Sequence, residues 1–175
     1  MSTSYLCLTN QNEVLNNGEW FDVEITEKFL NKTQDESGYS IKKQICITLS
    51  NEQHSLENEI LVTITKQGLN ETKLVEITKN NLAFDHIKII YYSIERLKNK
   101  LEYTDIIFNL LPQEFTLTEL KKCYETILNK QLLDANFRRK TTKFVTPTNN
   151  FVQGKGFRNS QLFVHNPLWD ISNLD

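Results

Sequence analysis

The chain has 175 residues, enough for one medium-sized domain or two small ones, and its hydrophobic content of 39% is ordinary for a globular protein. It has no apolar run of the roughly 18 residues that a membrane helix needs, and its N-terminus lacks the basic start and apolar core of a signal peptide, so no membrane partner is expected. The three cysteines have no paired spacing, so we expect neither a disulfide framework nor a zinc site, and a cytoplasmic location. No metal and no cofactor are expected.

Charge is distributed unevenly along the chain. The net charge is only −2, yet no acidic residue occurs from Ala135 to Trp169. The basic residues of this segment are Arg138, Arg139, Lys140, Lys143, Lys155 and Arg158. The remainder of the chain is correspondingly acidic. This asymmetry points to an anionic partner for the basic segment.

The first half of the chain carries the period-two pattern of β-strands. Strands are expected at residues 4–9, 19–23, 39–49, 59–66 and 72–78. Between Tyr39 and Leu49 the apolar residues fall on odd positions, which is the alternation of a half-buried strand. Residues 67–70 have the composition of a hairpin turn. We therefore predict a three-stranded antiparallel meander over residues 39–78.

From Asn81 onward the apolar residues recur every three or four positions, as in amphipathic helices. The expected helices are a long one over 84–101, a short one over 105–111, a third capped by Thr116 or Thr118 and reaching Asn129, and a fourth from an Asp134 cap to about Lys143. Two β-rich segments, 144–145 and 162–164, then flank a glycine-containing loop that carries Lys155 and Arg158. Three helices followed by a hairpin with a basic tip are the plan of a winged helix.

The fourth predicted helix has two distinct faces. At 100° per residue its apolar side, Leu133, Phe137, Thr141 and Phe144, is assigned to the core. The outer side presents Asn136, Arg138, Arg139 and Lys143. Arginine suits guanine edges, asparagine suits adenine edges and lysine suits phosphates, so this side fits a DNA major groove. The same helix spacing also fits a basic face that is only solvated. The wing segment likewise fits a soluble loop that binds no ligand.

Several segments of the second half match a known family: 82–86, 95–105, 110–120, 124–128, 156–158 and 162–163, and above all Asn136-Phe137-Arg138-Arg139-Lys140. Over about residues 82–167 the chain resembles the C-terminal domain of Nudix-related transcriptional regulators, the NrtR family. The resemblance implies a winged helix that binds double-stranded DNA. Its base-reading residues would be Asn136, Arg138 and Arg139, and its phosphate-binding residues Lys140, Lys143, Lys155 and Arg158. Asn159 stands where the family usually has a proline after the wing arginine.

The front of the chain fits this family only in part. Residues 2–6 and 19–23 resemble strands that follow the Nudix box, but the spacing of glycine, glutamate and arginine in that box does not occur in the sequence. The acidic cluster of Glu52, Glu57 and Glu59 lacks the spacing that places carboxylates around Mg²⁺ on one helix. We therefore expect no pyrophosphohydrolase activity. The ADP-ribose-like effector that the family senses through its Nudix domain would lack its usual site.

Together these patterns predict an α+β chain: a partial Nudix-like, β-rich domain over 1–82, a linking helix over 83–103, and a winged helix-turn-helix over 104–169. The recognition helix, about 134–143, would enter the major groove and the wing, about 145–164, would lie on the DNA backbone. We expect a repressor that acts as a homodimer, since helix-turn-helix proteins commonly read two half-sites, with NAD metabolism as the pathway that the family suggests. Two alternatives remain open: the C-terminal part of an ADP-ribose pyrophosphatase whose catalytic half is absent here, and a winged helix that binds protein.

Overall fold

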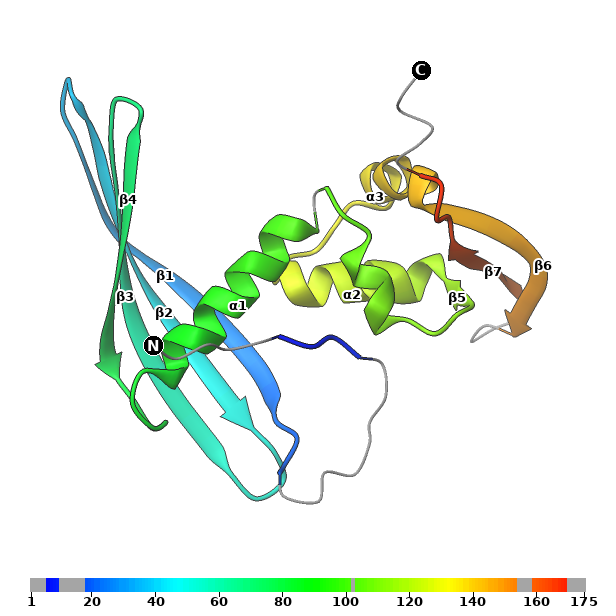
Figure 1. The fold of residues 1–175 in the computed structure, drawn as a ribbon, viewed down its shortest axis with the longest axis horizontal. Coiled ribbons are helices and arrows are strands. Elements are labelled where there is room, and N and C mark those ends of the chain that lie inside the picture. The colour runs from blue at the N-terminus through cyan, green and yellow to red at the C-terminus, as the bar shows by residue number, and fades with distance from the viewer. Residues whose placement is uncertain (1–5, 10–17, 102, 154–158, 170–175) are drawn as a thin grey trace. The chain divides into compact units, whose positions relative to one another are not determined.

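The computed structural model describes residues 6–9, 18–101, 103–153 and 159–169 (Figure 1). It divides into two compact units, one of Val14–Ser93 and the other of Met1–Glu13 with Ile94–Asp175. The boundary falls inside helix α1 (His86–Lys100), the long helix expected from the sequence. None of the helices in the described residues is long and apolar enough to cross a membrane.

The sheet unit is a four-stranded antiparallel meander. Its strands are β1 (Asp22–Gln34), β2 (Gly38–Ser50), β3 (Ser55–Gln67) and β4 (Asn70–Lys79), in that spatial order. The three strands predicted over 39–78 are confirmed, and so is the turn at Gly68, whose φ of 57° is one that glycine adopts easily. β1 was expected to span only 19–23. It runs far longer: Val23, Ile25 and Phe29 alternate with polar residues, whereas the end of the strand, residues 31–34, is polar throughout and shows no period-two pattern.

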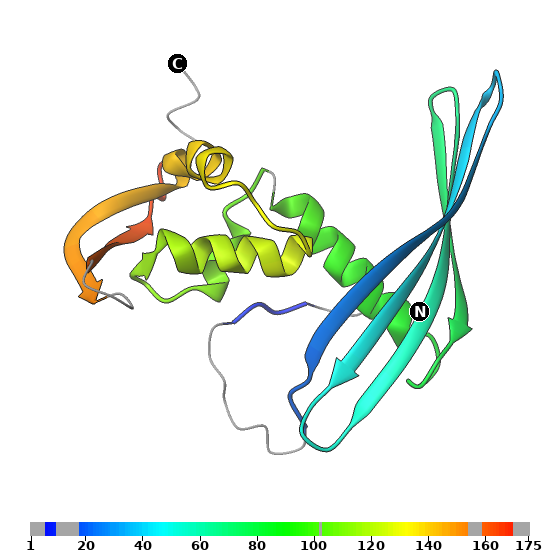
Figure 2. The same cartoon turned by 180° about the vertical axis from the view of Figure 1, so that it is seen from behind.

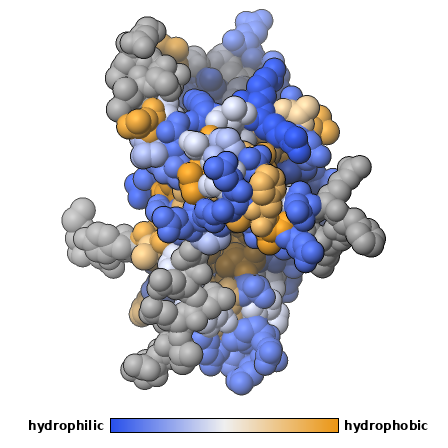
Figure 3. All heavy atoms as spheres, turned by 90° about the vertical axis from the view of Figure 1, so that its right-hand side faces the viewer, coloured by the Kyte–Doolittle hydropathy of each residue, from blue (hydrophilic) through white to orange (hydrophobic). Residues whose placement is uncertain are grey.

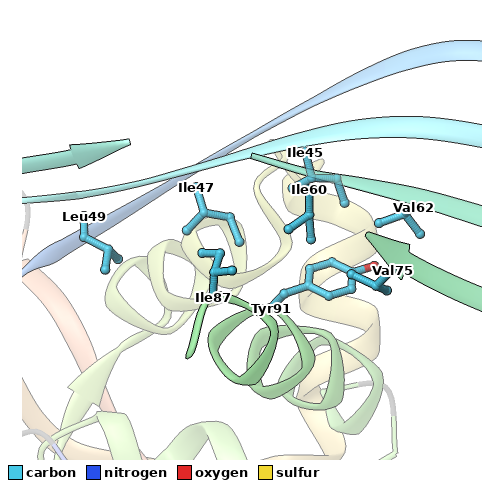
Figure 4. Packing of buried hydrophobic residues seen from close by; sticks show 8 residues of the cluster. All are labelled: Ile45, Ile47, Leu49, Ile60, Val62, Val75, Ile87 and Tyr91. Carbon is cyan, nitrogen blue, oxygen red and sulfur yellow. The ribbon is translucent and has the colours of Figure 1, made fainter. Parts of the chain in front are cut away.

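One face of this sheet holds the core of the unit. Figure 4 shows Ile45, Ile47 and Leu49 of β2 and Ile60 and Val62 of β3 directed toward Ile87 and Tyr91 of α1. The register pairs Ile45 with Ile60 and Ile47 with Asn58, so alternate residues of neighbouring strands reach the same face. Each fully buried aliphatic side chain stabilises the fold by about 1.5–3 kcal/mol. The first turns of α1 are therefore fixed on the sheet by apolar packing.

Asn58 is a polar residue inside this core. Its side-chain amide donates to the carbonyl oxygens of Leu56 at 3.1 Å and Ile47 at 3.4 Å, and its Oδ1 accepts from the backbone N–H of Asn81 at 2.7 Å. Buried polar groups are stable only when they are hydrogen-bonded in this way. Asn58 thus ties the segment before α1 to the sheet.

The second unit combines short helices with a small sheet. It contains the 3₁₀ helix η1 (Ile106–Leu110), β5 (Phe115–Thr116), α2 (Leu117–Leu128), α3 (Asp134–Thr141), the 3₁₀ helix η2 (Thr142–Phe144), β6 (Val145–Gln153) and β7 (Asn159–His165). The sheet order is β5-β7-β6. The chain thus contains the meander, the long helix and the winged helix that were predicted, which confirms the α+β fold.

Three further expectations were wrong. The strand predicted over 4–9 is absent at residues 6–9, where Leu6 and Cys7 are exposed in an irregular segment, and residues 4 and 5 lie outside the described part. Helix α1 starts at His86, because Phe84 adopts a positive φ of 49° that a right-handed helix cannot contain. Asp134 does not cap α3: Leu133 occupies the cap position without a side-chain hydrogen bond.

Candidate nucleic-acid interface

The first helix of the helix-turn-helix, α2, is capped as one of the two expected alternatives. Thr116 Oγ1 accepts a hydrogen bond from the backbone N–H of Glu119 at 3.2 Å, and the Glu119 carboxylate accepts one from the backbone N–H of Thr116 at 2.7 Å. This reciprocal pair is a capping box, which satisfies N–H groups that the helix leaves without partners. At the other end, Asn129 closes α2 in the left-handed conformation.

A cluster of charged side chains connects α2 with α3. Lys121 Nζ lies 2.5 Å from Asp134 Oδ1 on α3 and 3.5 Å from Glu125 Oε1 on its own helix. Glu125 Oε1 also accepts from the backbone N–H of Leu132 at 2.7 Å, in the turn between the helices. The hydrogen bond from Lys121 lowers the pKa of Asp134, which starts the first turn of α3. The cluster therefore fixes the turn and the angle at which α3 is presented.

The inner side of α3 packs into the core of the second unit. Phe137, Thr141 and the following Phe144 are buried, as predicted, and the Phe137 ring meets the Tyr124 ring edge-on at 5.7 Å. Leu133 was assigned to the same side, but its side chain is 73% exposed. It precedes the first turn of α3, so the helical spacing that relates Phe137 to Thr141 does not apply to it.

The outer side of α3 is the candidate interface. Asn136, Arg138, Arg139 and Lys140 are all exposed, so the structure brings these four predicted residues together on one short helix. Among the described residues, no carboxylate forms an ion pair with any of the three basic side chains. Lys143, in η2, is also exposed, and its Nζ lies 4.8 Å from the Phe144 ring centre and 5.2 Å from that of Trp169. The positive charges of these basic side chains can therefore bind an external anion.

An apolar hollow of about 890 Å³ lies beside α3. Leu101, Tyr124, Leu128 and Phe137 contribute apolar lining, whereas Arg139, Lys140 and Lys143 supply positive charge. These long basic side chains consequently have open space around them and can change rotamer without displacing the core. Figure 3, which looks toward the β6 and β7 side, shows a mainly hydrophilic surface with scattered hydrophobic residues.

The wing is a hairpin of β6 and β7, held against β5. Phe115 and Thr116 of β5 pair with Phe163 and Leu162 of β7, and a register shift in β6 separates Pro147 from Phe151. The predicted wing residues Lys155 and Arg158 lie outside the described residues. The structure therefore gives the base of the wing, and the roles of its two cations stay predictions.

Two positioning features were missed at the sequence level. Lys121 and Glu125 carry the spacing of an ordinary i,i+4 pair, and only the fold shows that Lys121 also reaches α3. At the end of β7, His165 stacks on Phe108 with ring centres 4.4 Å apart, and its Nε2 lies 3.2 Å from Asp105 Oδ2. This contact joins the wing to the segment around η1.

Burial makes Tyr124 sensitive to alkaline pH. Loss of hydration raises the pKa of Tyr124 to about 12, above the value of about 10 for a free tyrosine. The unfolded chain therefore loses this proton first, so we expect stability to fall as the pH rises from about 10 to about 12. Urea unfolding of the protein and of Tyr124→Phe across this range would measure the effect. The difference between the two free energies of unfolding should shift with pH; a constant difference would contradict the raised pKa.

The second unit is similar to known proteins. Residues 107–164 match the family model described as the NrtR DNA-binding winged helix domain. The chain is 43% identical over 67 residues to the ADPR responsive transcriptional repressor NtrR of Acinetobacter baylyi, a match that covers 38% of this chain and 27% of the relative. A crystal structure of Shewanella oneidensis NrtR complexed with a 27mer DNA is 28% identical, with a TM-score of 0.45, over 54% of this chain and 47% of that one. Residues 107–164 of this chain thus match the DNA-binding winged helix domain of the NrtR family, and the chain spans about a quarter of the length of the curated relative that it matches.

Proposed function

We propose that this chain is a cytoplasmic transcriptional repressor that binds double-stranded DNA as a homodimer through its winged helix domain. The observation that carries the proposal is the outer side of α3, where Arg138, Arg139 and Lys140 are exposed and form no ion pair with another described residue. The match to a DNA-binding winged helix family and the repressor name of the Acinetobacter relative support it. The alternative of a hydrolase fragment is not favoured by these relatives.

In this proposal α3 enters the major groove. An α-helix with its side chains is about 10–12 Å across, which fits a groove about 12 Å wide. Asn136, Arg138 and Arg139 read base edges. The phosphates are held by Lys140 and Lys143 beside α3 and by Lys155 and Arg158 at the wing. The carboxylates of Asp134 and Glu125 are bonded to Lys121 and to the backbone of Leu132, so we propose that this cluster positions α3.

The proposed role is regulatory and not enzymatic. The Acinetobacter relative is named as a repressor that responds to ADPR, and the match to it covers only 27% of its length. We therefore propose no response to ADPR for this chain. The regulated genes are proposed to lie in NAD metabolism, as the family resemblance suggests.

A salt titration tests the proposal directly. Four phosphate-binding cations in each of two protomers would give a log–log slope of affinity against salt of about −7, at about −0.9 for each phosphate neutralised. Fluorescence anisotropy with fragments of the source genome would measure the binding constant between 50 and 200 mM salt. We expect tight binding to a few fragments and a loss of roughly 10³-fold or more over this range.

Scrambled fragments of the same base composition are the control. They should bind weakly, with a similar dependence on salt, because phosphate contacts do not distinguish sequences. A partner that binds with an affinity insensitive to salt would favour the protein-binding alternative. Equal affinity for genomic and scrambled fragments would contradict a specific repressor.

A further inference from the structure

The apolar hollow beside α3 has the size of a small-molecule site. Its volume of about 890 Å³ lies in the range of roughly 300–1,000 Å³ that ligand pockets have. The lining comes from Leu101 after the end of α1, from α2, from the turn that links α2 to α3, and from α3 with η2 (Figure 2). All of these residues belong to the second unit. The hollow is therefore a feature of the winged helix unit alone.

The floor of the hollow is apolar and fixed by the core. Leu101, Tyr124, Phe137 and Phe144 line it, and each of these side chains is only 4–8% exposed. Leu101, Tyr124 and Phe137 belong to one buried cluster, against which Leu128 packs. The floor is thus held in place by packing that exists without a ligand. A preformed apolar surface of this kind favours a ligand with an apolar body.

The charged residues described in the lining all carry the same sign. They are Lys130 in the turn, Arg139 and Lys140 on α3, and Lys143 in η2, and all four are exposed. No ion pair joins any of them to a carboxylate within the described part of the chain. Arg138, the neighbour of Arg139 in the sequence, does not line the hollow. The rim of the hollow, defined by these four cations, therefore selects an anionic group.

We propose that the hollow binds a small organic anion with an apolar body. The carboxylate, sulfonate or phosphate of this ligand lies on the rim, where hydrogen bonds from cations to an anion are stronger than those between neutral groups. Its aromatic or aliphatic body covers the apolar floor and leaves water. An inorganic anion lacks the body and a neutral alcohol lacks the charge, so each binds more weakly than a molecule that has both.

The ligand site shares three cations with the proposed DNA surface. Arg139, Lys140 and Lys143 cannot hold the anionic group of the ligand and a DNA phosphate or base at the same time, so ligand and DNA compete. A ligand at 100 times its dissociation constant should then lower the affinity of a protomer for DNA roughly 100-fold. This competition rests on the proposed repressor function, whereas binding in the hollow does not. The hollow would make the repressor responsive to a metabolite of this chemical class.

A fluorescent probe tests the site on the full chain in the absence of DNA. Anilinonaphthalene sulfonate has an apolar body and one negative charge, and it becomes bright when it leaves water. We expect one probe molecule per chain, displaced by decanoate. Decanol and inorganic phosphate should displace the probe at least about tenfold less well, because each offers only one of the two contacts. Near-UV circular dichroism must confirm native packing, since this probe also binds molten globules.

Charge variants locate the probe. Lys130→Glu reverses a rim charge that is not assigned to DNA, and we expect the probe dissociation constant to rise roughly tenfold. Lys122→Glu makes the same change at an exposed position of α2 outside the hollow and should stay within about twofold of the wild type. Arg139→Ala should weaken both probe and DNA. Arg138→Ala should weaken DNA alone.

Four results would overturn the ligand site. Equal displacement by decanol and decanoate would remove the role of the rim, and equal probe affinity in Lys130→Glu and Lys122→Glu would place the probe elsewhere. Probe binding that tightens tenfold when residues 170–175 are deleted would make that segment the occupant. Probe affinity that falls as the protein concentration rises would make a second copy the occupant.

DNA binding measured by anisotropy on the same samples keeps the two proposals apart. Decanoate that displaces the probe should also release DNA over the same concentration range. Displacement of the probe with unchanged DNA affinity would refute the competition. A chain that binds the probe in the hollow but no DNA would refute only the repressor, and a chain that binds DNA but no probe would refute only the ligand site.

Discussion

Replacing Arg138 and Arg139 together by alanine is expected to abolish sequence-specific DNA binding by this chain. A base-reading arginine contributes about 1–3 kcal/mol, so the four arginines of two half-sites give a loss of roughly 1000-fold or more in affinity for a cognate fragment. Both side chains are exposed on α3 and neither is ion-paired with a described residue, so their removal leaves the fold intact. Fluorescence anisotropy with the fragment bound most tightly by the wild type measures the loss.

A matched control removes the same charge elsewhere. Lys42→Ala with Lys66→Ala deletes two exposed cations from the sheet unit and should change the affinity only slightly. Binding to scrambled fragments, which depends on phosphates, should weaken much less in the arginine variant than specific binding does. Specific affinity that survives the loss of both arginines would remove α3 from the base-reading surface. The winged helix domain would then have to contact its partner through another element.

The parts of the site that sequence could predict are those governed by local rules. Phe137, Thr141 and Phe144 recur at helical spacing, and the fold buries all three. The cap at Thr116 follows from a threonine three residues before Glu119, a pattern that satisfies its own backbone groups. The exposure of Arg138 and Arg139 follows from the same helical geometry, because a helix that buries one side must present the other.

The parts that sequence could not predict depend on contacts between distant residues. Aspartate is a residue type that often caps helices, but the carboxylate of Asp134 is bound by Lys121 of α2. Only the packing of the two helices brings Lys121 Nζ to 2.5 Å from Asp134 Oδ1. The end of β1, residues 31–34, is wholly polar and shows no alternation, and pairing with β2 forms it nevertheless, since the backbone hydrogen bonds of a ladder do not depend on side-chain polarity. A contact such as that of His165 with Asp105 likewise joins residues far apart in the chain.

Phe115→Ala is expected to be the most destabilising of the changes considered for the winged helix. The Phe115 side chain is 1% exposed, and its ring centre lies 5.5 Å from that of Phe108. Its strand β5 pairs with Phe163 of the wing, so the residue joins the helical and β parts of the domain. Deleting a buried phenyl ring costs about 3–5 kcal/mol, a large fraction of the roughly 5–15 kcal/mol that stabilises an ordinary domain.

Urea unfolding followed by tryptophan fluorescence measures this loss in the second unit. Trp169 packs 4.5 Å from Phe144 and reports on the winged helix, and a Trp20→Phe background removes the signal of the sheet unit. Leu133→Ala is the control, since a side chain that is 73% exposed should cost less than about 0.5 kcal/mol. If both variants lost the same stability, Phe115 would not be a core residue. Because Phe115 packs in the same cluster as Phe137 of α3, the fraction of Phe115→Ala that binds DNA should follow the fraction that remains folded.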